Sequence, residues 1–371
     1  MRIGIPKEIK DKEFRVAIIP AGVRKLVDSG NTVIIESGAG LGSSIFDEEF
    51  ADAGAKLVKS ASSVYNEADM VIKVKEPLPQ EYDYMREGLI LFTYLHLAPL
   101  PELTLVLLDR KVSAIAYETV RQENDYLPLL APMSEVAGRM SIQVGAHFLE
   151  KETGGRGILL GGVATVEPGH VTILGSGTVG TNAAQMAVGL GARVTVMSRN
   201  TNRLAELESL FQGEITTLQT NKQNIVEEIS QADLLVGAVL VPGATAPKLI
   251  TREMLSLMQK GSVIVDVSID QGGCVETARP TSHSVPVYEV EGIIHYCVAN
   301  MPGAVPRTST FALTNATLPY ALAIASKGLF KAAKEDSALK KGINTFVGML
   351  TNKEVALAQD KKYTDIDELL S

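Results

Sequence analysis

A short glycine pattern places the strongest constraint on what this chain can fold into. The segment HVTILGSGTVG contains Gly175, Gly177 and Gly180, which form G-x-G-x-x-G directly after an apolar run and at the start of a helical pattern. In such a unit the first glycine permits a tight turn, the second lets the backbone approach a pyrophosphate, and the third allows close packing of helix on strand. The amides at the N-terminus of the helix then face the phosphates. The pattern predicts a dinucleotide-binding domain.

Short β-branched runs alternate with helical segments around this motif. Six strands are expected in this part of the chain, which is typical of one complete doubly wound parallel sheet. The repetition favours a dinucleotide site over the alternative of an ordinary glycine-rich turn. The expected strands are residues 171–174, 193–197, 215–218, 234–239, 263–267 and 293–298.

The first third of the chain shows the same alternation, with helices such as 21–29 between strands. A turn-rich stretch at 127–132 precedes an expected linking helix at 133–151. The fold class is therefore α/β with two domains: a doubly wound parallel Rossmann-type nucleotide-binding domain and a discontinuous α/β substrate domain. The expected strands of the first third are residues 2–5, 32–36, 70–74, 89–93 and 112–116.

Turn-forming residues indicate where the domains meet. The segment NMPGAVPRT at 300–308 has two prolines and a glycine, which interrupt regular structure. The residues after it, 309–333 and 339–349, have a helical pattern and are too poor in strands for a third domain. They are expected to return to the first domain. The expected division is residues 1–130 for the first segment of the substrate domain, 131–306 for the nucleotide-binding domain and 307–371 for the helical return.

Composition argues against several classes of function. Of the 371 residues, 46% are hydrophobic and 21% charged, as in globular proteins, and a net charge of -8 with scattered Lys and Arg argues against nucleic acid as a partner. The two cysteines, Cys274 and Cys297, have neither the spacing nor the companions of a zinc site, so no metal is expected. The charged N-terminus and the lack of a long apolar run predict a cytoplasmic protein without a membrane segment.

The second strand of the nucleotide-binding domain departs from the usual NAD site, which has an Asp or Glu near its end to bind the ribose hydroxyls. In VTVMSRN that position is Ser198, followed by Arg199 and, further on, Arg203. A serine with arginines nearby favours a 2′-phosphate. Alternatively, Ser198 bonds a ribose hydroxyl and the arginines are solvated. NAD is the expected cofactor, with NADP use left open.

Candidate catalytic residues end two apolar runs. His96 closes LILFTYLHL. Histidine is the side chain best suited to exchange a proton with an alcohol or carbinolamine, because a free imidazole changes charge near neutral pH. A histidine at a strand end is equally often structural. Asp270 follows another run in VIVDVSIDQGG and is better placed than Asp266, although a turn carboxylate is an equal alternative.

Two cations, Lys75 and Arg15, lie next to apolar runs and are candidate substrate-binding residues. Lys75 ends the run in MVIKVKEP, and Arg15 lies in KEFRVAIIP before a proline that can start a helix. A cation at a cleft can hold a substrate carboxylate, and Arg does so bidentately. For any single Lys or Arg, however, a surface charge is the more common outcome.

Together these segments resemble the alanine dehydrogenase family. The resemblance covers essentially the whole chain and implies reversible oxidative deamination of L-alanine to pyruvate and ammonium with NAD. Family members are typically hexamers, so a homo-oligomer, by resemblance a hexamer, is expected. The segments that carry the resemblance are IPKE with Arg15, VKEP with Lys75, FTYLHLA with His96, APMSEVAGRMS, GGVATVEPGHVTILGSGTVG, VDVSIDQGG and VYEVEGIIHYCVANMPGAVPRTST.

The resemblance also implies residue roles. Arg15 and Lys75 match the substrate-binding cations, His96 the acid/base, and Asp270 the second catalytic residue. Ser198 stands where the family usually has an aspartate. The implied cofactor contacts, some through the backbone, are Ser134, Gly175, Gly177, Thr178, Val179, Gly180, Ser198, Arg203, Thr220, Val239, Leu240, Val267, Asp270, Arg279, Val298, Asn300 and Met301.

Three other interpretations remain. The NAD(H)-binding soluble component of a proton-translocating transhydrogenase resembles the same family, but retention of His96, Lys75 and Asp270 without a membrane segment argues against it. An opine-forming or lysine-linked dehydrogenase is a more distant alternative. A catalytically silent NAD sensor would keep the glycines and lose the substrate cations, which this chain retains.

Overall fold

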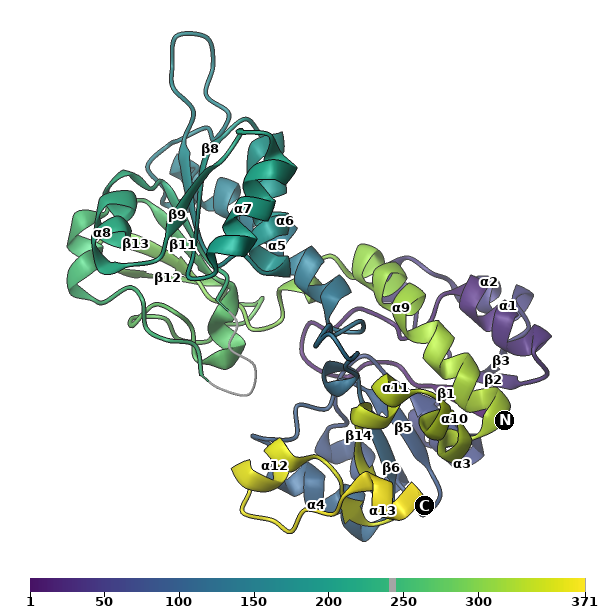
Figure 1. The fold of residues 1–371 in the computed structure, drawn as a ribbon. Helices are drawn as coiled ribbons and strands as arrows, with labels where there is room; N and C mark the ends of the chain where they lie inside the picture. The colour runs from purple at the N-terminus through teal and green to yellow at the C-terminus, as the bar shows by residue number, and fades with distance from the viewer. Residues whose placement is uncertain (240–244, 371) are drawn as a thin grey trace. The chain divides into compact units, whose positions relative to one another are not determined.

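The computed structural model describes residues 1–239 and 245–370. It divides into two compact units, Met1–Met133 with Gly303–Ser371, and Ser134–Pro302 (Figure 1). Each unit is built on one largely parallel sheet, which confirms the expected α/β class.

The sheet of the first unit has eight strands in the order β15-β14-β6-β5-β4-β1-β2-β3. Strands β1 to β6 are parallel, and their order 3-2-1-4-5-6 is that of a doubly wound fold. Strands β14 and β15 extend one edge in antiparallel pairing. The strands are β1 (Arg2–Ile5), β2 (Thr32–Glu36), β3 (Lys56–Val58), β4 (Met70–Ile72), β5 (Ile90–Thr93), β6 (Ser113–Ala116), β14 (Ile343–Phe346) and β15 (Met349–Leu350).

The sheet of the second unit has seven strands in the order β12-β13-β11-β10-β7-β8-β9. Its six parallel strands follow the same 3-2-1-4-5-6 order, and β12 pairs antiparallel with β13 at one edge. The central strands are buried along their whole length, as expected for a parallel sheet covered on both faces. The strands are β7 (His170–Leu174), β8 (Arg193–Ser198), β9 (Thr216–Gln219), β10 (Leu234–Gly237), β11 (Val263–Asp266), β12 (Val287–Val290) and β13 (Ile293–Tyr296).

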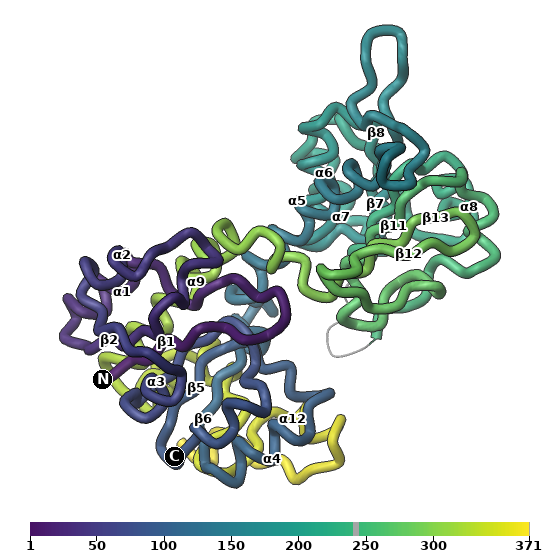
Figure 2. The backbone as a smooth tube through the Cα atoms, turned by 180° about the vertical axis from the view of Figure 1, so that it is seen from behind, coloured from purple at the N-terminus to yellow at the C-terminus, as the bar shows by residue number. Residues whose placement is uncertain are grey.

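Helices connect and cover the strands. In the first unit the long helix α9 packs on α1 (Figure 1), and the C-terminal segment lies beside α4 (Figure 2). The Gln359 amide in this segment donates to the hydroxyl of Thr104 on α4. Among the described residues, no helix is both long enough and apolar enough to cross a membrane. The helices are α1 (Pro20–Asp28), α2 (Asp47–Asp52), α3 (Ala61–Glu67), α4 (Pro101–Asp109), α5 (Ala131–Phe148), α6 (Thr178–Gly189), α7 (Thr201–Phe211), α8 (Lys222–Gln231), α9 (Pro306–Lys327), α10 (Leu329–Glu335), α11 (Ser337–Gly342), α12 (Lys353–Ala358) and α13 (Ile366–Leu370).

The last part of the chain shares the core of the first unit. Leu350 and Val355 belong to the same buried cluster as Val71, Leu91 and Ala114, which lie on β4, β5 and β6. Burial of this shared apolar surface holds the C-terminal segment against the sheet that begins the chain.

All strands expected from the sequence are present, with ends shifted by at most two residues. Strands β3 and β12 were not expected. Both are short edge strands whose residues are partly exposed, so neither presents a run of buried apolar side chains. The expected helix at 309–333 is interrupted at Gly328, whose φ of 75° ends α9 before α10 begins.

The helix expected at 339–349 is present only as far as Gly342, and the prediction is wrong for the residues after it, so the segment 307–371 is not wholly helical. Helix α11 ends at Gly342, and the chain continues into β14 beside β6. The pairing shifts register between Ile343 and Thr345, so the strand lacks regular alternation. The Thr345 hydroxyl compensates by donating to the carbonyl of Val112 (2.8 Å) and accepting from the amide of Ala114 (3.3 Å).

Replacing Thr345 with valine should lower the free energy of unfolding by about 1–3 kcal/mol, because a buried carbonyl and a buried amide would lose a partner. Urea unfolding measures the change. Thr345→Ser is the matched control, since it keeps the hydroxyl and should lose less stability. Equal losses in the two variants would show that the hydroxyl does not hold this edge.

Candidate functional site

In open α/β sheets, ligands bind beyond the carboxyl ends of the strands, where the strand order reverses. In the first unit this reversal lies between β1 and β4. Lys75 follows β4 and His96 follows β5, while Glu8 follows β1 and Glu118 follows β6. The unit therefore brings two of the predicted residues to the edge of the sheet where a ligand is expected.

Arg15, Lys75 and His96 surround the buried ring of Tyr94. The Lys75 Nζ lies 5.9 Å from the ring centroid, and the His96 imidazole stacks at 5.9 Å with 8° between the planes. Burial raises the pKa of Tyr94, and the nearby positive charge of Arg15 lowers it by a smaller amount, so the phenol is neutral. The Tyr94 hydroxyl donates to the carbonyl of Leu129 at 2.6 Å. Sequence reasoning missed Tyr94, although it lies two residues before His96 in FTYLHLA.

The Arg15 side chain is only 2% exposed, so it is not a solvated surface charge. Its Nε and Nη2 donate to the two carboxylate oxygens of Glu13 at 2.7 and 2.6 Å, and Nη1 lies 3.1 Å from the sulfur of Met133. This bidentate pairing fixes the plane of the guanidinium. The predicted substrate cation is thus oriented by a neighbouring carboxylate.

His96 has a left-handed backbone with φ of 47°, a conformation that costs a non-glycine residue about 1 kcal/mol or more. The Glu118 carboxylate accepts from the amides of His96 (2.6 Å) and Leu95 (3.2 Å) and holds this turn. Its Oε1 is 3.9 Å from His96 Nδ1, while the imidazole itself is 43% exposed. Glu118 therefore supports the backbone that presents His96. The sequence analysis missed it because it follows a different strand.

In the second unit, the glycine motif forms the turn between β7 and α6. A Cβ on Gly175, whose φ is 119°, would lie 2.3 Å from the Ala238 carbonyl oxygen, and one on Gly180 would lie 1.9 Å from the Gly175 oxygen. A Cβ on Gly177, at the N-cap of α6, would meet no described atom within 4 Å. Gly175 and Gly180 are thus required by the fold, whereas the space beside Gly177 fits a pyrophosphate at the helix N-terminus. Thr178 and Val179 begin that helix.

Ser198 ends β8 beside the glycine turn. Its Oγ accepts from the Ser176 hydroxyl at 2.7 Å and from the Asn200 amide at 3.2 Å, and its carbonyl accepts from the Thr220 amide at 3.0 Å. The structure therefore brings Ser198 and Thr220 together with the glycine turn.

Arg203 braces the same turn. Its Nε donates to the Ser176 carbonyl at 3.1 Å, Nη2 donates to the Thr181 hydroxyl at 3.1 Å, and Nη1 pairs with Glu206 at 2.5 Å. The guanidinium of Arg203 is thus bonded to protein groups. This differs from the alternative, considered in the sequence analysis, that Arg203 is a solvated surface charge. Arg199, by contrast, is exposed.

A cavity of about 600 Å³ opens beside the ends of β8 and β9. Arg199, Thr220 and Lys222 line it together with apolar side chains such as Leu249. Lys222, which is exposed, and Lys248 add two further cations to Arg199, and Glu253 is an acidic residue in the same lining. The cavity could accept a group that is partly apolar and carries negative charge.

Asp270 lies in a short 3₁₀ helix, Val267–Gln271, directly after β11, and it is exposed. Asp266, by contrast, is buried and accepts from the amides of Ser268 (3.1 Å), Cys274 (2.8 Å) and Val275 (3.2 Å). Burial raises the pKa of Asp266, and the hydrogen bonds from the three amides partly offset this increase because they stabilise the charged carboxylate. Asp266 therefore holds the loop that presents Asp270.

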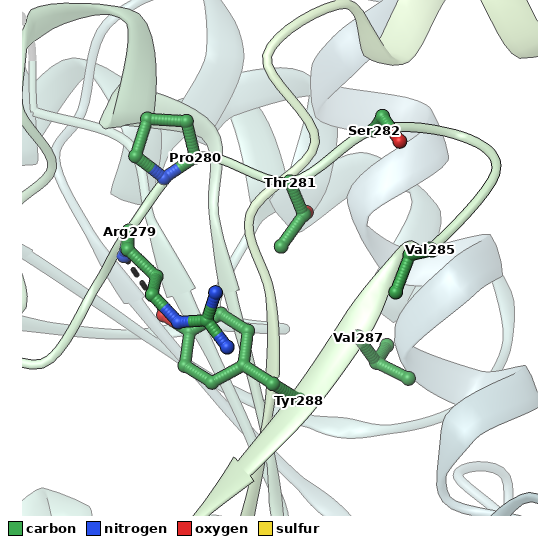
Figure 3. A pocket seen from close by; sticks show the side chains of 7 residues that line it. All are labelled: Arg279, Pro280, Thr281, Ser282, Val285, Val287 and Tyr288. Atoms are coloured by element: carbon green, nitrogen blue, oxygen red, sulfur yellow. Dashed lines mark hydrogen bonds between the residues drawn. The ribbon is translucent and has the colours of Figure 1, made fainter.

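Arg279 lines a second cavity of about 340 Å³ with Val285 and Val287 (Figure 3). Its guanidinium lies 4.1 Å from the centre of the Tyr288 ring, and its amide donates to the Tyr288 hydroxyl at 2.8 Å. Stacking on an aromatic face thus holds this cation at the surface of the second unit.

Other predicted cofactor residues also follow strands. Val239 follows β10, Val267 follows β11 and Val298 follows β13. Ser134 lies in α5, the carbonyl oxygen of Asn300 is 2.7 Å from His283 Nε2, and Met301 is buried. Leu240 lies outside the described residues. Within the part of the chain that the structure describes, no group of three or more His, Cys, Asp or Glu side chains could hold a metal.

Replacing Gly177 with alanine should leave thermal stability nearly unchanged while weakening NADH binding by about tenfold, or 1.4 kcal/mol, because the new methyl would occupy space that only a ligand fills. Gly180→Ala should reduce both quantities, since its Cβ would collide with the backbone. Fluorescence titration with NADH and thermal melts of both variants provide the comparison. Unaltered NADH affinity in Gly177→Ala would rule out a pyrophosphate at this turn.

The chain is similar in sequence to alanine dehydrogenases over its whole length. The family models described as "Alanine dehydrogenase/PNT, N-terminal domain" and "Alanine dehydrogenase/PNT, C-terminal domain" match residues 4–137 and 141–353. The alanine dehydrogenase of Methanococcus maripaludis is 59% identical over 100% of both chains. That of Staphylococcus haemolyticus is 56% identical over 100% of this chain and 99% of the relative.

Solved structures show the same pattern. An L-alanine dehydrogenase matches with a TM-score of 0.94 and 52% identity over 100% of both chains. A transhydrogenase from Sinorhizobium meliloti matches with a TM-score of 0.81 and 24% identity, covering 95% of this chain and 99% of that one. At that identity the likeness concerns the fold alone.

Proposed function

The chain belongs to the alanine dehydrogenase/PNT family, and we propose that it catalyses the reversible oxidative deamination of L-alanine to pyruvate and ammonium with NAD. The similarity at 59% identity over the full length of an alanine dehydrogenase carries this proposal. Arg15, Lys75 and His96 around Tyr94 support it from the structure. The transhydrogenase alternative is weaker, because the solved transhydrogenase is only 24% identical to this chain, against 59% for that alanine dehydrogenase. The same identity and coverage favour an alanine dehydrogenase over an opine-forming or lysine-linked dehydrogenase.

NAD supplies the hydride acceptor when it is bound. The second unit would hold it with the amides of Thr178 and Val179 at the start of α6, beside the open space at Gly177. Val239, Val267 and Val298, which follow neighbouring strands of the same sheet, would flank it. The other predicted contacts are Ser134 in α5, Thr220, Arg279, Asn300 and Met301, together with Leu240, which lies outside the described residues.

The first unit would bind the amino acid. Arg15 binds the substrate carboxylate with a guanidinium that Glu13 holds in one plane. Lys75 places an ammonium group against the oxygen on the reacting carbon and stabilises negative charge there. These two cations suit the anionic end and the carbonyl end of pyruvate.

His96 and Asp270 would move the protons. Oxidation of the amine leaves an iminium, water attacks it to give a carbinolamine, and this loses ammonia to give pyruvate. Asp270 orients the water, and His96 accepts a proton from it and delivers one to the departing nitrogen. One proton is released overall with NADH, pyruvate and ammonium.

Oxidation of NADH in the presence of pyruvate and ammonium tests this function directly. Glyoxylate and 2-oxobutyrate serve as competing oxo acids, and they distinguish the proposed enzyme from related dehydrogenases. Absence of turnover with pyruvate and ammonium, while NADH still binds, would refute the proposal.

His96→Ala and Asp270→Asn should each reduce turnover by at least about 10²-fold, the contribution of one general acid or base. Neither change removes a group assigned to the pyrophosphate, so NADH affinity should persist in His96→Ala. Steady-state kinetics and NADH titration measure both effects. If one variant turned over like the parent, that residue would lose its catalytic role.

We propose that NAD is the working cofactor and that discrimination against NADP is weak. Ser198 can bond a ribose hydroxyl, but unlike a carboxylate it does not repel a 2′-phosphate. Arg199 and Lys222 lie at the adjoining cavity and would attract that phosphate, whereas Arg203 is engaged with Glu206 and the glycine turn.

Ser198→Asp should therefore depress kcat/KM for NADPH much more than for NADH, by about tenfold or more if one repulsive contact is worth 1.4 kcal/mol. Ser198→Asn is the control of similar size without the charge. The two cofactors are compared in all three proteins. If the parent already rejects NADPH as strongly as the aspartate variant, selectivity comes from the shape of the pocket.

We also propose a homo-oligomer, by family resemblance a hexamer, in the cytoplasm, with L-alanine, pyruvate and ammonium as its small-molecule partners. Cys274 and Cys297 are buried and free, which suits a reducing compartment. Light scattering of the full chain measures the oligomeric state.

A further inference from the structure

A buried charge cluster lies beneath the substrate residues of the first unit, and the mechanism above does not use it. Lys73 Nζ is 3.2 Å from Glu8 Oε2 and 2.9 Å from Glu81 Oε1, and these three side chains are at most 3% exposed. The Tyr65 hydroxyl donates to Glu81 at 3.0 Å. Buried charges are costly to retain unless each is paired, so the cluster invites a specific explanation.

Glu8 reaches from the cluster to the backbone that carries Lys75. Its Oε1 accepts from the amide of Val74 at 2.6 Å and from that of Lys75 at 3.4 Å, while Oε2 faces Lys73. Burial raises the pKa of Glu8, and the ammonium of Lys73 is the main opposing influence. One carboxylate thus ties the end of β1 to the segment after β4.

A second side chain holds the carbonyl group of Lys75. β4 itself ends at Ile72, and the Thr93 hydroxyl on β5 donates to the Lys75 carbonyl at 2.9 Å. Thr93 is fully buried. Both main-chain polar groups of Lys75 are therefore bonded by side chains, one from the segment after β1 and one from β5.

We propose that Glu8, aided by Thr93, is a positioning residue that holds Lys75 where its ammonium can meet the substrate oxygen. The inference rests on the proposed role of Lys75 in binding pyruvate. A lysine has a long flexible side chain, so its reach is defined only if its backbone is fixed. A displacement of about 1 Å at a reacting group can cost about 10²-fold in rate, which explains why buried charge is retained here.

Glu8→Gln tests the proposal, because an amide has one oxygen and cannot both accept from the backbone and face Lys73. The affinity of the NADH-loaded protein for oxamate, an unreactive analogue of pyruvate, should fall roughly tenfold, with NADH affinity unchanged. Thr93→Val, which is nearly isosteric, should lower oxamate affinity in the same way, and Thr93→Ser should restore it. Thr93→Val carries the test if Glu8→Gln does not fold.

Glu81→Gln is the matched control, since it perturbs the same buried cluster without touching the Lys75 backbone. It should lower thermal stability and leave oxamate affinity near that of the parent. An equal loss of oxamate affinity in Glu81→Gln and Glu8→Gln would show that the cluster acts through stability alone and would overturn the inference.

A double-variant cycle with Lys75→Met separates this inference from the proposed function. In the Lys75→Met background, Glu8→Gln should cause little further loss of oxamate affinity, whereas a multiplying loss would overturn the inference. If Lys75→Met itself binds oxamate normally, the proposed role of Lys75 fails. If it binds poorly while Glu8→Gln and Thr93→Val bind normally, only the positioning role fails.

Discussion

The reversal of strand order beside the first strand of each sheet is the constraint on which both candidate sites depend. It lies between β1 and β4 in the first unit and between β7 and β10 in the second. Connections on the two sides of a reversal run to opposite faces of the sheet, so the loops at its carboxyl edge separate and leave room for a ligand. One arrangement, used twice, provides a glycine turn for a dinucleotide in one unit and a ring of polar side chains in the other.

In the first unit, a glutamate carboxylate holds each of the three predicted substrate and catalytic residues. Glu13 holds the guanidinium of Arg15, Glu118 holds the strained backbone of His96, and Glu8 holds the backbone of Lys75. Each carboxylate accepts hydrogen bonds from groups that would otherwise move or remain unsatisfied. Such support fixes the two cations and the imidazole at defined positions, so the proposed binding of an anionic substrate would need little reorganisation.

Regular strands were predictable because burial on both faces requires continuous apolar runs, as in β7, β10 and β11. Strands that are short, lie at an edge or shift register lack such a run and were not predictable from the sequence. β14 shows the reason: its pairing is irregular, and the hydroxyl of Thr345 replaces ladder bonds. Local periodicity carries no information about a partner strand more than 200 residues away in sequence.

The sequence by itself determined the fold class, the glycine turn and the resemblance to the alanine dehydrogenase family. It also identified the candidate site residues His96, Asp270, Arg15 and Lys75. Each of these depends on residue types within a short segment. Only the tertiary structure revealed the partners that hold them. Glu118 is 22 residues from His96, and Glu8 is 67 residues from Lys75. These pairs meet because parallel pairing places the ends of β1, β4, β5 and β6 along one edge, a relation that arises only when the sheet forms.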